Sequence, residues 1–282
     1  MSPRDRVLIT AAELMRRLAG GERPAILDVR WRLDTPDGRP GYLDGHIPGA
    51  VYVSLEDELS DHRIPGRGRH PLPSGAGLQE AARRWGLRAG QAIVVYDDWN
   101  RAGSSRAWWV LTAAGVSDVR ILDGGLAAWV SAGGALESGV VTGAAGDLEI
   151  ACPDLYAGRR PTLTADQVAG SACPTLLDAR APERFRGEVE PLDPVAGHIP
   201  GARNLPSTSL LAADGTFLPR AEIASRLAAC GATDSVAVYC GSGVTASVVL
   251  AALSAAGVEG ALFPGSWSQW SAEAGRPVAT GG

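Results

Sequence analysis

Lysine is absent from this sequence of 282 residues, so all 26 basic residues are arginines. This absence excludes enzymes that form a Schiff base between a lysine amine and a carbonyl substrate. No run of 18 or more apolar residues occurs, so the sequence offers no membrane-spanning helix. The net charge of −5 gives no reason to expect nucleic acid, although clustered arginines could still form local anion sites.

Cysteine is scarce as well, with only Cys152, Cys173, Cys230 and Cys240. These four show neither Cys-x-x-Cys spacing nor paired histidines, so we expect no zinc site. We also expect no other metal and no organic cofactor. The N-terminus lacks the apolar core of a signal peptide, and we therefore expect a cytoplasmic protein with free thiols. The chain length suits two domains of ordinary size.

One of the four cysteines occupies a distinctive position. Residues 236–239 form a β-branched and aromatic run that predicts a buried strand, and the apolar run 247–256 predicts a helix. Cys240 follows the strand, and a loop with two glycines leads from it into the helix. Loop N–H groups and the helix dipole at such a place favour a thiolate and an anion above it. We interpret Cys240 as a reactive nucleophile, although an isolated cysteine is more often structural.

The segment Cys240-Gly241-Ser242-Gly243-Val244-Thr245 resembles the active loop of the two-domain sulfurtransferases of the rhodanese superfamily, specifically of its mercaptopyruvate branch. The thiosulfate branch usually carries basic residues at the positions of Gly241 and Ser242. The resemblance implies two tandem α/β domains, each a mainly parallel sheet with helices on both faces. It also implies that sulfane sulfur passes from 3-mercaptopyruvate, through a Cys240 persulfide, to a thiol, thioredoxin-like or cyanide acceptor.

The chain also repeats itself. Leu-Asp-x-Arg occurs at 27–30 and 177–180, and Gly-His-Ile-Pro-Gly-Ala occurs at 45–50 and 197–202. Two copies with so long a period indicate a duplicated domain rather than a solenoid. We therefore predict a first domain over 1–135, a linker over 136–160 and a catalytic domain over 161–282.

Each copy alternates short buried strands with helical runs, which predicts a parallel sheet with helices on both faces. In the first copy the strands are expected at 25–29, 92–96 and 119–122, and helices at 11–18 and 106–114.

The first copy has lost the nucleophile, because Asp97 stands where the second copy has Cys240. A carboxylate cannot carry a transferable sulfur, so we expect the first domain to be inactive and to form one wall of an interdomain cleft.

The repeated polar residues divide into scaffold and candidate site. We assign Asp28, Arg30, Asp178 and Arg180 to the scaffold, because an Asp/Arg pair at a strand end satisfies buried groups. We interpret His198 as structural. In the family the first-half histidine can approach the cysteine loop, so His46 is a candidate site residue and a relay from Ser242 to His46 is possible.

Two arginines after the second repeat are candidates for binding the donor. The resemblance implies that Arg184 binds the substrate carboxylate, which a guanidinium does bidentately, and Arg186 lies two residues on. The branch usually has a second such arginine further on, where this chain has Leu192. The substrate site is therefore predicted to contain Cys240, the loop residues Gly241 to Thr245, Arg184, Arg186 and His46.

Three alternatives remain open. Thiosulfate could be the donor. A cysteine phosphatase or arsenate reductase uses a similar loop but needs an arginine six residues after the nucleophile, where this chain has Ala246. A non-catalytic rhodanese-like binding module would suit the first half better than the second, whose loop is intact.

Overall fold

A computed structural model of the chain describes residues 1–170, 175–232 and 235–282. The first half contains a five-stranded sheet with the order β1-β5-β4-β2-β3, in which every pairing is parallel. Its strands are β1 (Leu8–Ile9), β2 (Ala25–Asp28), β3 (Val51–Tyr52), β4 (Ile93–Tyr96) and β5 (Val119–Leu122).

The second half repeats this arrangement with a four-stranded parallel sheet of order β7-β6-β8-β9. Its strands are β6 (Thr175–Asp178), β7 (Arg203–Asn204), β8 (Val236–Tyr239) and β9 (Gly260–Leu262). Strands β2 and β6, which end in the two Leu-Asp-x-Arg repeats, occupy equivalent central positions next to β4 and β8. The internal repeat seen in the sequence is therefore a repeat of the fold.

Helices cover both faces of each sheet. In the first half, α4 (Leu55–Glu58), α5 (Gly75–Arg84) and α6 (Ala102–Ala113) bury apolar residues on one face, and α2 (Ala11–Ala19) and α7 (Gly125–Ser131) on the other. In the second half, α10 (Arg220–Ala229) and α11 (Ala246–Ala256) lie opposite α8 (Ala165–Ala169), α9 (Pro182–Phe185) and α12 (Ser266–Trp270). The short helices α1 (Pro3–Val7), α3 (Arg39–Asp44), η1 (Leu155–Ala157) and η2 (Ser207–Leu210) complete the fold.

The predicted α/β architecture is confirmed, and the predicted elements agree with the structure to within one residue except at one helix. Helix α6 begins at Ala102 rather than at residue 106. Its first turn, Ala102-Gly103-Ser104-Ser105, is buried, and the small side chains that make it look like a loop in the sequence let it pack closely against Val29, directly after β2. A Cβ on Gly103 would lie 1.8 Å from the Val29 carbonyl oxygen.

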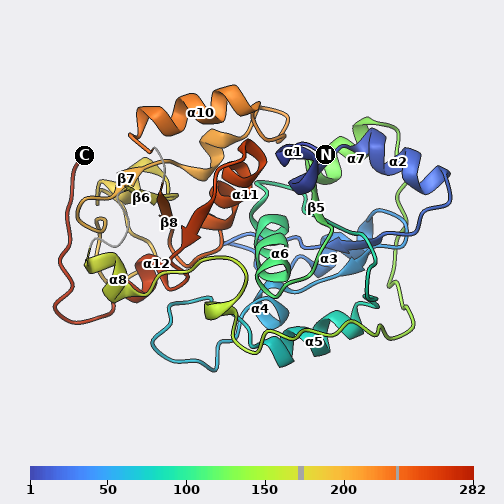
Figure 1. Ribbon diagram of the computed structural model, residues 1–282, viewed down its shortest axis with the longest axis horizontal. Coiled ribbons are helices and arrows are strands. Elements are labelled where there is room, and N and C mark those ends of the chain that lie inside the picture. Colours follow the sequence, from blue (N-terminus) through green and yellow to red (C-terminus); the bar gives the residue numbers. More distant parts are fainter. Residues whose placement is uncertain (171–174, 233–234) are drawn as a thin grey trace.

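The two halves share one continuous apolar core. Helices α6 and α11 lie side by side at the centre of the molecule, and α1 packs on α11 (Figure 1). Both central helices are buried along nearly their whole length. Helix α11 is apolar on nearly all sides, whereas α6 also buries Ser104, Ser105 and Arg106. This contact fixes how the loop before α11 faces the first half.

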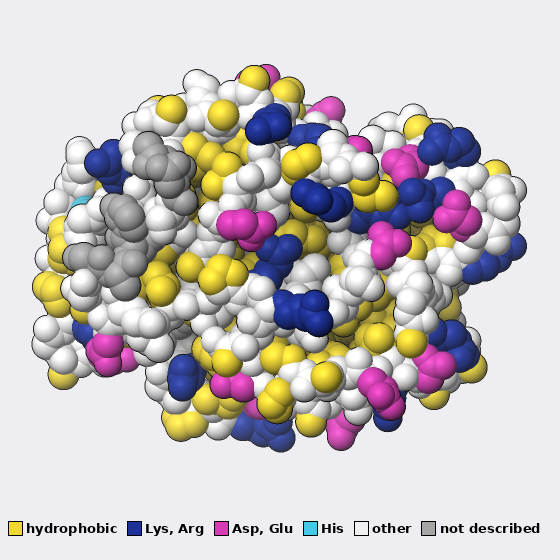
Figure 2. Space-filling view, viewed as in Figure 1, with side chains coloured by type: hydrophobic (Ala, Val, Ile, Leu, Met, Phe, Trp, Pro, Cys, Tyr) yellow, Lys and Arg dark blue, Asp and Glu magenta, His cyan; other side chains and the backbone are white. Residues whose placement is uncertain are grey.

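The segment between the halves runs along both of them. Gly146 and Leu148 donate backbone hydrogen bonds to Arg83 and Leu87 in the first half, and Leu163 donates one to Leu262 of β9. The surface shown in Figure 2 intersperses basic and acidic side chains with apolar ones, without a large region of one sign. Within residues 1–170, 175–232 and 235–282, no helix is long and apolar enough to cross a bilayer.

Candidate active site

Cys240 lies at the carboxyl end of β8, in the loop that leads into α11. The Gly243 amide donates a hydrogen bond to Cys240 Sγ at 3.1 Å, and the Cys240 amide donates to Ser266 Oγ at 3.1 Å. Gly243 has a φ of 78°, and a Cβ there would lie 2.5 Å from the Pro264 carbonyl oxygen, so the curl of the loop requires glycine. The side chain of Cys240 is thus fixed, with an N–H donor directed at the sulfur.

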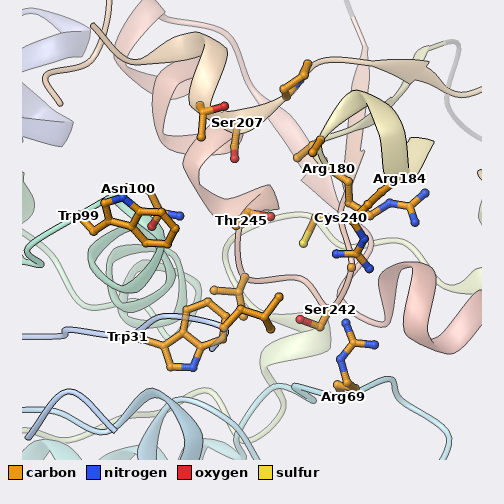
Figure 3. Close-up of a pocket in the computed structure, with 17 residues that line it drawn as sticks. Trp31, Arg69, Trp99, Asn100, Arg180, Arg184, Ser207, Cys240, Ser242 and Thr245 are labelled. Carbon is orange, nitrogen blue, oxygen red and sulfur yellow. The ribbon is translucent and has the colours of Figure 1, made fainter. Parts of the chain in front are cut away.

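A cavity of about 220 Å³ between the two halves opens onto Cys240. Figure 3 shows Trp31, Trp99 and Asn100 of the first half on one side of the cysteine sulfur, and Arg69, Arg180 and Arg184 on the other. Cys240 is only 1% exposed, so a substrate reaches the sulfur through this cavity. Among the described residues, no group of three or more His, Cys, Asp or Glu side chains is placed to hold a metal ion.

A chain of hydrogen bonds leads from the cysteine loop into the first half. His70 Nδ1 lies 2.7 Å from Ser242 Oγ, and His70 Nε2 lies 3.0 Å from Glu56 Oε1. Glu56 is held by the Trp31 indole, which donates to the same oxygen at 2.6 Å, and by His62 at 3.0 Å from the other. The nucleophile and the histidine beside it therefore come from different halves of the chain.

The surroundings of Glu56 and His70 determine the protonation states of these two side chains. Burial raises the pKa of Glu56, but hydrogen bonds from His70 and Trp31 outweigh it and bring the pKa to about 2. Burial lowers the pKa of His70, against the opposing effect of Glu56. At neutral pH Glu56 is a carboxylate that can only accept, so His70 donates through Nε2. His70 Nδ1 is left to accept from the Ser242 hydroxyl, which makes His70 a base for a proton arriving through Ser242.

Two guanidinium groups lie beside the loop at Gly241. A Cβ on Gly241 would lie 3.1 Å from Arg69 Nη2 and 3.4 Å from Arg184 Nη1. Arg184 pairs with Glu190 at 2.6 Å and with Asp193 at 3.3 Å, and Arg69 also pairs with Asp193. The two acidic residues hold both arginines at the cavity and offset their charge.

The structure brings most of the predicted site residues together. Cys240, Gly241, Ser242, Val244, Thr245 and Arg184 line the cavity, and Gly243 contacts the sulfur. The Asp28–Arg30 and Asp178–Arg180 pairs are buried ion pairs at 2.9 and 2.6 Å. Cys173 lies outside the described residues.

His46 is not at the cysteine loop, contrary to its place among the candidates. It is buried, stacks on Tyr42, and lies 2.8 Å from the Tyr42 carbonyl and 3.2 Å from Glu137. His198 repeats this arrangement, stacked on Phe185 and 2.7 Å from the Phe185 carbonyl. Each histidine braces the turn of its own repeat, and His70 occupies the position beside Ser242.

Arg186 also lies away from the cavity. Its side chain is exposed and pairs with Glu188 at 2.7 Å. Arg184 lies in the last turn of the short helix α9, and Arg186 directly follows this helix. Residues two positions apart on a helix point to different sides, so the two side chains diverge. Leu192, at the position where a second arginine was expected, is exposed and does not line the cavity.

Sequence reasoning missed Arg69, His70 and Glu56. Arg69 and His70 belong to an irregular first-half segment, and Glu56 belongs to the short helix α4. All three lie outside the repeated motifs, so the comparison of the two copies did not point to them. The one available signal was the segment Arg67-Gly68-Arg69-His70, in which basic residues alternate with glycine within a loop.

Asp97 fills the loop of the first half that corresponds to the cysteine loop. Its carboxylate accepts hydrogen bonds from the Ser104 amide at 3.0 Å and the Ser104 hydroxyl at 2.7 Å, and it pairs with Arg101 at 2.9 Å. Arg101 is buried and has a φ of 63°, a conformation that residues other than glycine rarely adopt. The Asp97 side chain thus holds this loop in shape through its contacts with Ser104 and Arg101.

Replacing Asp97 by alanine should therefore destabilise the fold. Arg101 would be left as an uncompensated buried charge, and we expect the free energy of unfolding to fall by about 3–5 kcal/mol. Asp98→Ala, which removes an exposed ion pair to Arg32, should cost at most about 1 kcal/mol. Urea unfolding of both variants measures the difference, and equal stabilities would contradict the assigned role.

Comparisons with known proteins agree with this geometry. A family model described as "Rhodanese-like domain" matches residues 10–132 and 163–273. A Mycobacterium tuberculosis protein named "Putative thiosulfate sulfurtransferase SseB" is 62% identical over all of this chain and 99% of its own length. A Pseudomonas aeruginosa protein named "Probable 3-mercaptopyruvate sulfurtransferase" is 45% identical, covering 97% of this chain and 98% of its own.

A solved structure supports the same assignment. The crystal structure of SseA from Escherichia coli, described as a 3-mercaptopyruvate sulfotransferase with a rhodanese fold, superposes with a TM-score of 0.80 and 34% identity. The match covers 93% of this chain and 98% of that one. The resemblance of the cysteine loop is thereby confirmed, and the chain belongs to the rhodanese-like family as a two-domain sulfurtransferase.

Proposed function

We propose that this protein transfers sulfane sulfur from 3-mercaptopyruvate to a thiol or cyanide acceptor through a persulfide on Cys240. The observation that carries the choice of donor is the chain from Ser242 through His70 to Glu56, next to the buried sulfur. A proton-transferring group there serves a donor that has a thiol proton and a carbonyl group, and thiosulfate has neither.

In the first half-reaction the Cys240 thiolate attacks the donor sulfur. The S–S bond forms while the C–S bond breaks, and the electron pair of that bond passes into the enolate of pyruvate. The donor's thiol proton moves through Ser242 to His70 and returns to the enolate, so pyruvate leaves and the persulfide remains as an anion. The Gly243 amide, directed at Cys240 Sγ, stabilises the attacking thiolate.

In the second half-reaction an acceptor thiolate or cyanide attacks the outer sulfur and restores the Cys240 thiolate. The acceptor must enter the same cavity, because Cys240 is reached through it. A small thiol, cyanide or a thioredoxin-like protein with a protruding cysteine satisfies this condition. The free thiols of Cys152, Cys230 and Cys240 suit a reducing cytoplasm.

Thiosulfate is the second candidate donor, and Arg69 is the observation in its favour. The sequence gives Gly241 and Ser242 no formal charge, but Arg69 brings a guanidinium from the first half to this position. The charge is largely offset, however, because Asp193 and Glu190 pair with Arg69 and Arg184. A site whose three arginines are each paired with carboxylates suits the single carboxylate of mercaptopyruvate better than a compact dianion.

Donor kinetics test this proposal. We expect a higher kcat/KM for 3-mercaptopyruvate than for thiosulfate, with cyanide as the common acceptor. Arg184→Ala and Arg69→Ala should each lower the mercaptopyruvate value by about 10–100-fold, since a hydrogen bond to a charged group contributes about 1.5–3 kcal/mol. Arg186→Ala is the matched control, and we expect it to change kcat/KM by less than about two-fold, as for other surface ion pairs.

Turnover of thiosulfate equal to or faster than that of mercaptopyruvate would contradict the choice of donor. In that case Arg69→Ala should lower the thiosulfate activity most, because Arg69 supplies the charge that the loop lacks.

A further inference from the structure

Arg106, in the helix α6 of the first half, is a buried arginine without a carboxylate partner. Its side chain is 0% exposed, and in the described parts of the chain no Asp or Glu lies within ion-pair distance of it. A buried charge is costly unless other groups compensate it, so Arg106 calls for a physical explanation.

The guanidinium of Arg106 joins three segments by donating hydrogen bonds to backbone carbonyls. Nη1 donates to Gly243 at 3.2 Å, and Nη2 donates to His70 at 3.0 Å and to Leu59 at 3.1 Å. Gly243 is the loop residue whose amide contacts Cys240 Sγ. Arg106 therefore ties the cysteine loop of one half to the histidine segment of the other.

Carbonyl groups compensate only part of this charge. Burial lowers the pKa of Arg106 to about 10, while Tyr156, Cys240 and Glu56 act in the opposite direction. Arg106 is thus still a cation at neutral pH. Glu56 is engaged by His70, Trp31 and His62, and Tyr156 is a neutral phenol whose pKa burial raises further. The sulfur of Cys240 is the remaining group that can supply a negative charge.

The other arginines around the cavity differ in this respect. Arg180 pairs with Asp178, and Arg184 and Arg69 pair with Glu190 and Asp193, so carboxylates offset their charges. Arg106 lies behind the loop, outside the residues that line the cavity, and does not compete with the donor for space.

We propose that Arg106 is the positioning residue through which the first half stabilises the anionic sulfur of Cys240, both as thiolate and as persulfide. The half that has lost its own nucleophile thereby provides the buried positive charge for the nucleophile of the other half. The inference rests on the proposed function only in that Cys240 is the reactive thiol.

Alkylation of Cys240 by iodoacetamide, a neutral reagent, tests the proposal without any sulfur donor. In Arg106→Gln we expect the alkylation rate to be about ten-fold lower at about pH 6.5, and within about three-fold of the unmodified protein at about pH 9, which is above the pKa of about 8.5 of an ordinary thiol. Arg106→Lys keeps the charge and should stay within about three-fold at both values. Peptide mass spectrometry separates Cys240 from the other three cysteines.

Arg120→Gln is the matched control, because Arg120 is a buried arginine that pairs with Glu13 and Asp118 and does not line the cavity. We expect it to lower stability without changing the alkylation rate of Cys240. The titratable groups facing Cys240 and Arg106 (Glu56, His70 and Tyr156) are unchanged in every variant.

An equal loss at both pH values would show a purely structural role and overturn the proposal, as would an unchanged rate in folded Arg106→Gln. If Arg106→Gln does not fold, Arg106→Lys decides, and a ten-fold loss at about pH 6.5 in that variant contradicts a role for the charge. Failure of mercaptopyruvate turnover with a normal alkylation response would count against the proposed donor and not against Arg106.

Discussion

Cys240→Ser is expected to abolish sulfur transfer from every donor, lowering kcat by about 10⁴-fold or more. The loop amide of Gly243 is directed at the atom at this position, but a serine hydroxyl remains protonated at neutral pH and is a poor acceptor of sulfane sulfur. Intact-protein mass spectrometry after incubation with 3-mercaptopyruvate provides the direct measurement. The unmodified protein should gain the mass of one sulfur atom, and the variant should gain none.

The other thiols provide the controls. Cys152 and Cys230 lie outside the cavity, and burial raises the pKa of Cys230, which disfavours a reactive thiolate there. Cys152→Ser and Cys230→Ser should keep activity within about two-fold, as expected of substitutions away from a site. Transfer activity that persists in Cys240→Ser, or a persulfide found on another cysteine, would refute the mechanism.

His70→Gln should have the next largest effect, and a donor-specific one. Glutamine can still hydrogen-bond to Ser242 or Glu56 but cannot take up a proton, and loss of a general base costs about 10²–10⁴-fold. We expect a loss of this size in kcat with 3-mercaptopyruvate and much less with thiosulfate, which has no thiol proton to move. Steady-state rates with both donors on one preparation make the comparison independent of the folded fraction.

The pH dependence of kcat/KM also tests the role of His70 as a base. His70 acts as a base, and burial lowers its pKa, so it stays neutral to lower pH than an ordinary histidine. The acid limb of kcat/KM for mercaptopyruvate should therefore lie below about pH 6.5 and should be absent in His70→Gln. His46→Gln should lower thermal stability but leave kcat of the folded enzyme unchanged. A loss in His46→Gln equal to that in His70→Gln would contradict the placement of the two histidines.

The sequence predicts well what depends on short stretches of chain. The strand before Cys240, the glycine curl and the helix after it are encoded within about twenty consecutive residues, and the duplicated motifs repeat the same local design. The sheets follow from the alternation of β-branched strands with helical runs. Asp97 as an inactive counterpart of Cys240 follows from aligning the two copies.

Contacts between the two halves could not be predicted from the sequence. Ser242 and His70 are 172 positions apart, and nothing in either segment specifies that they meet. Among the four histidines, the repeated motif led to the choice of His46 as a candidate. The choice was misleading, because repeated motifs include residues of structural turns as readily as site residues. The roles of Arg69 and Arg106 were not predicted either, because a guanidinium can reach a distant loop from almost any element.

The shared core between α6 and α11 makes the two halves depend on each other. The half without the nucleophile carries His70, Arg69 and Arg106, which are the proposed base, a proposed donor-binding arginine and the buried charge behind the loop. Substitutions in either half should therefore impair sulfur transfer, although through different residues in each. A chain consisting of the second half alone would lack these groups and would leave the apolar helix α11 uncovered, so we expect it neither to fold stably nor to transfer sulfur.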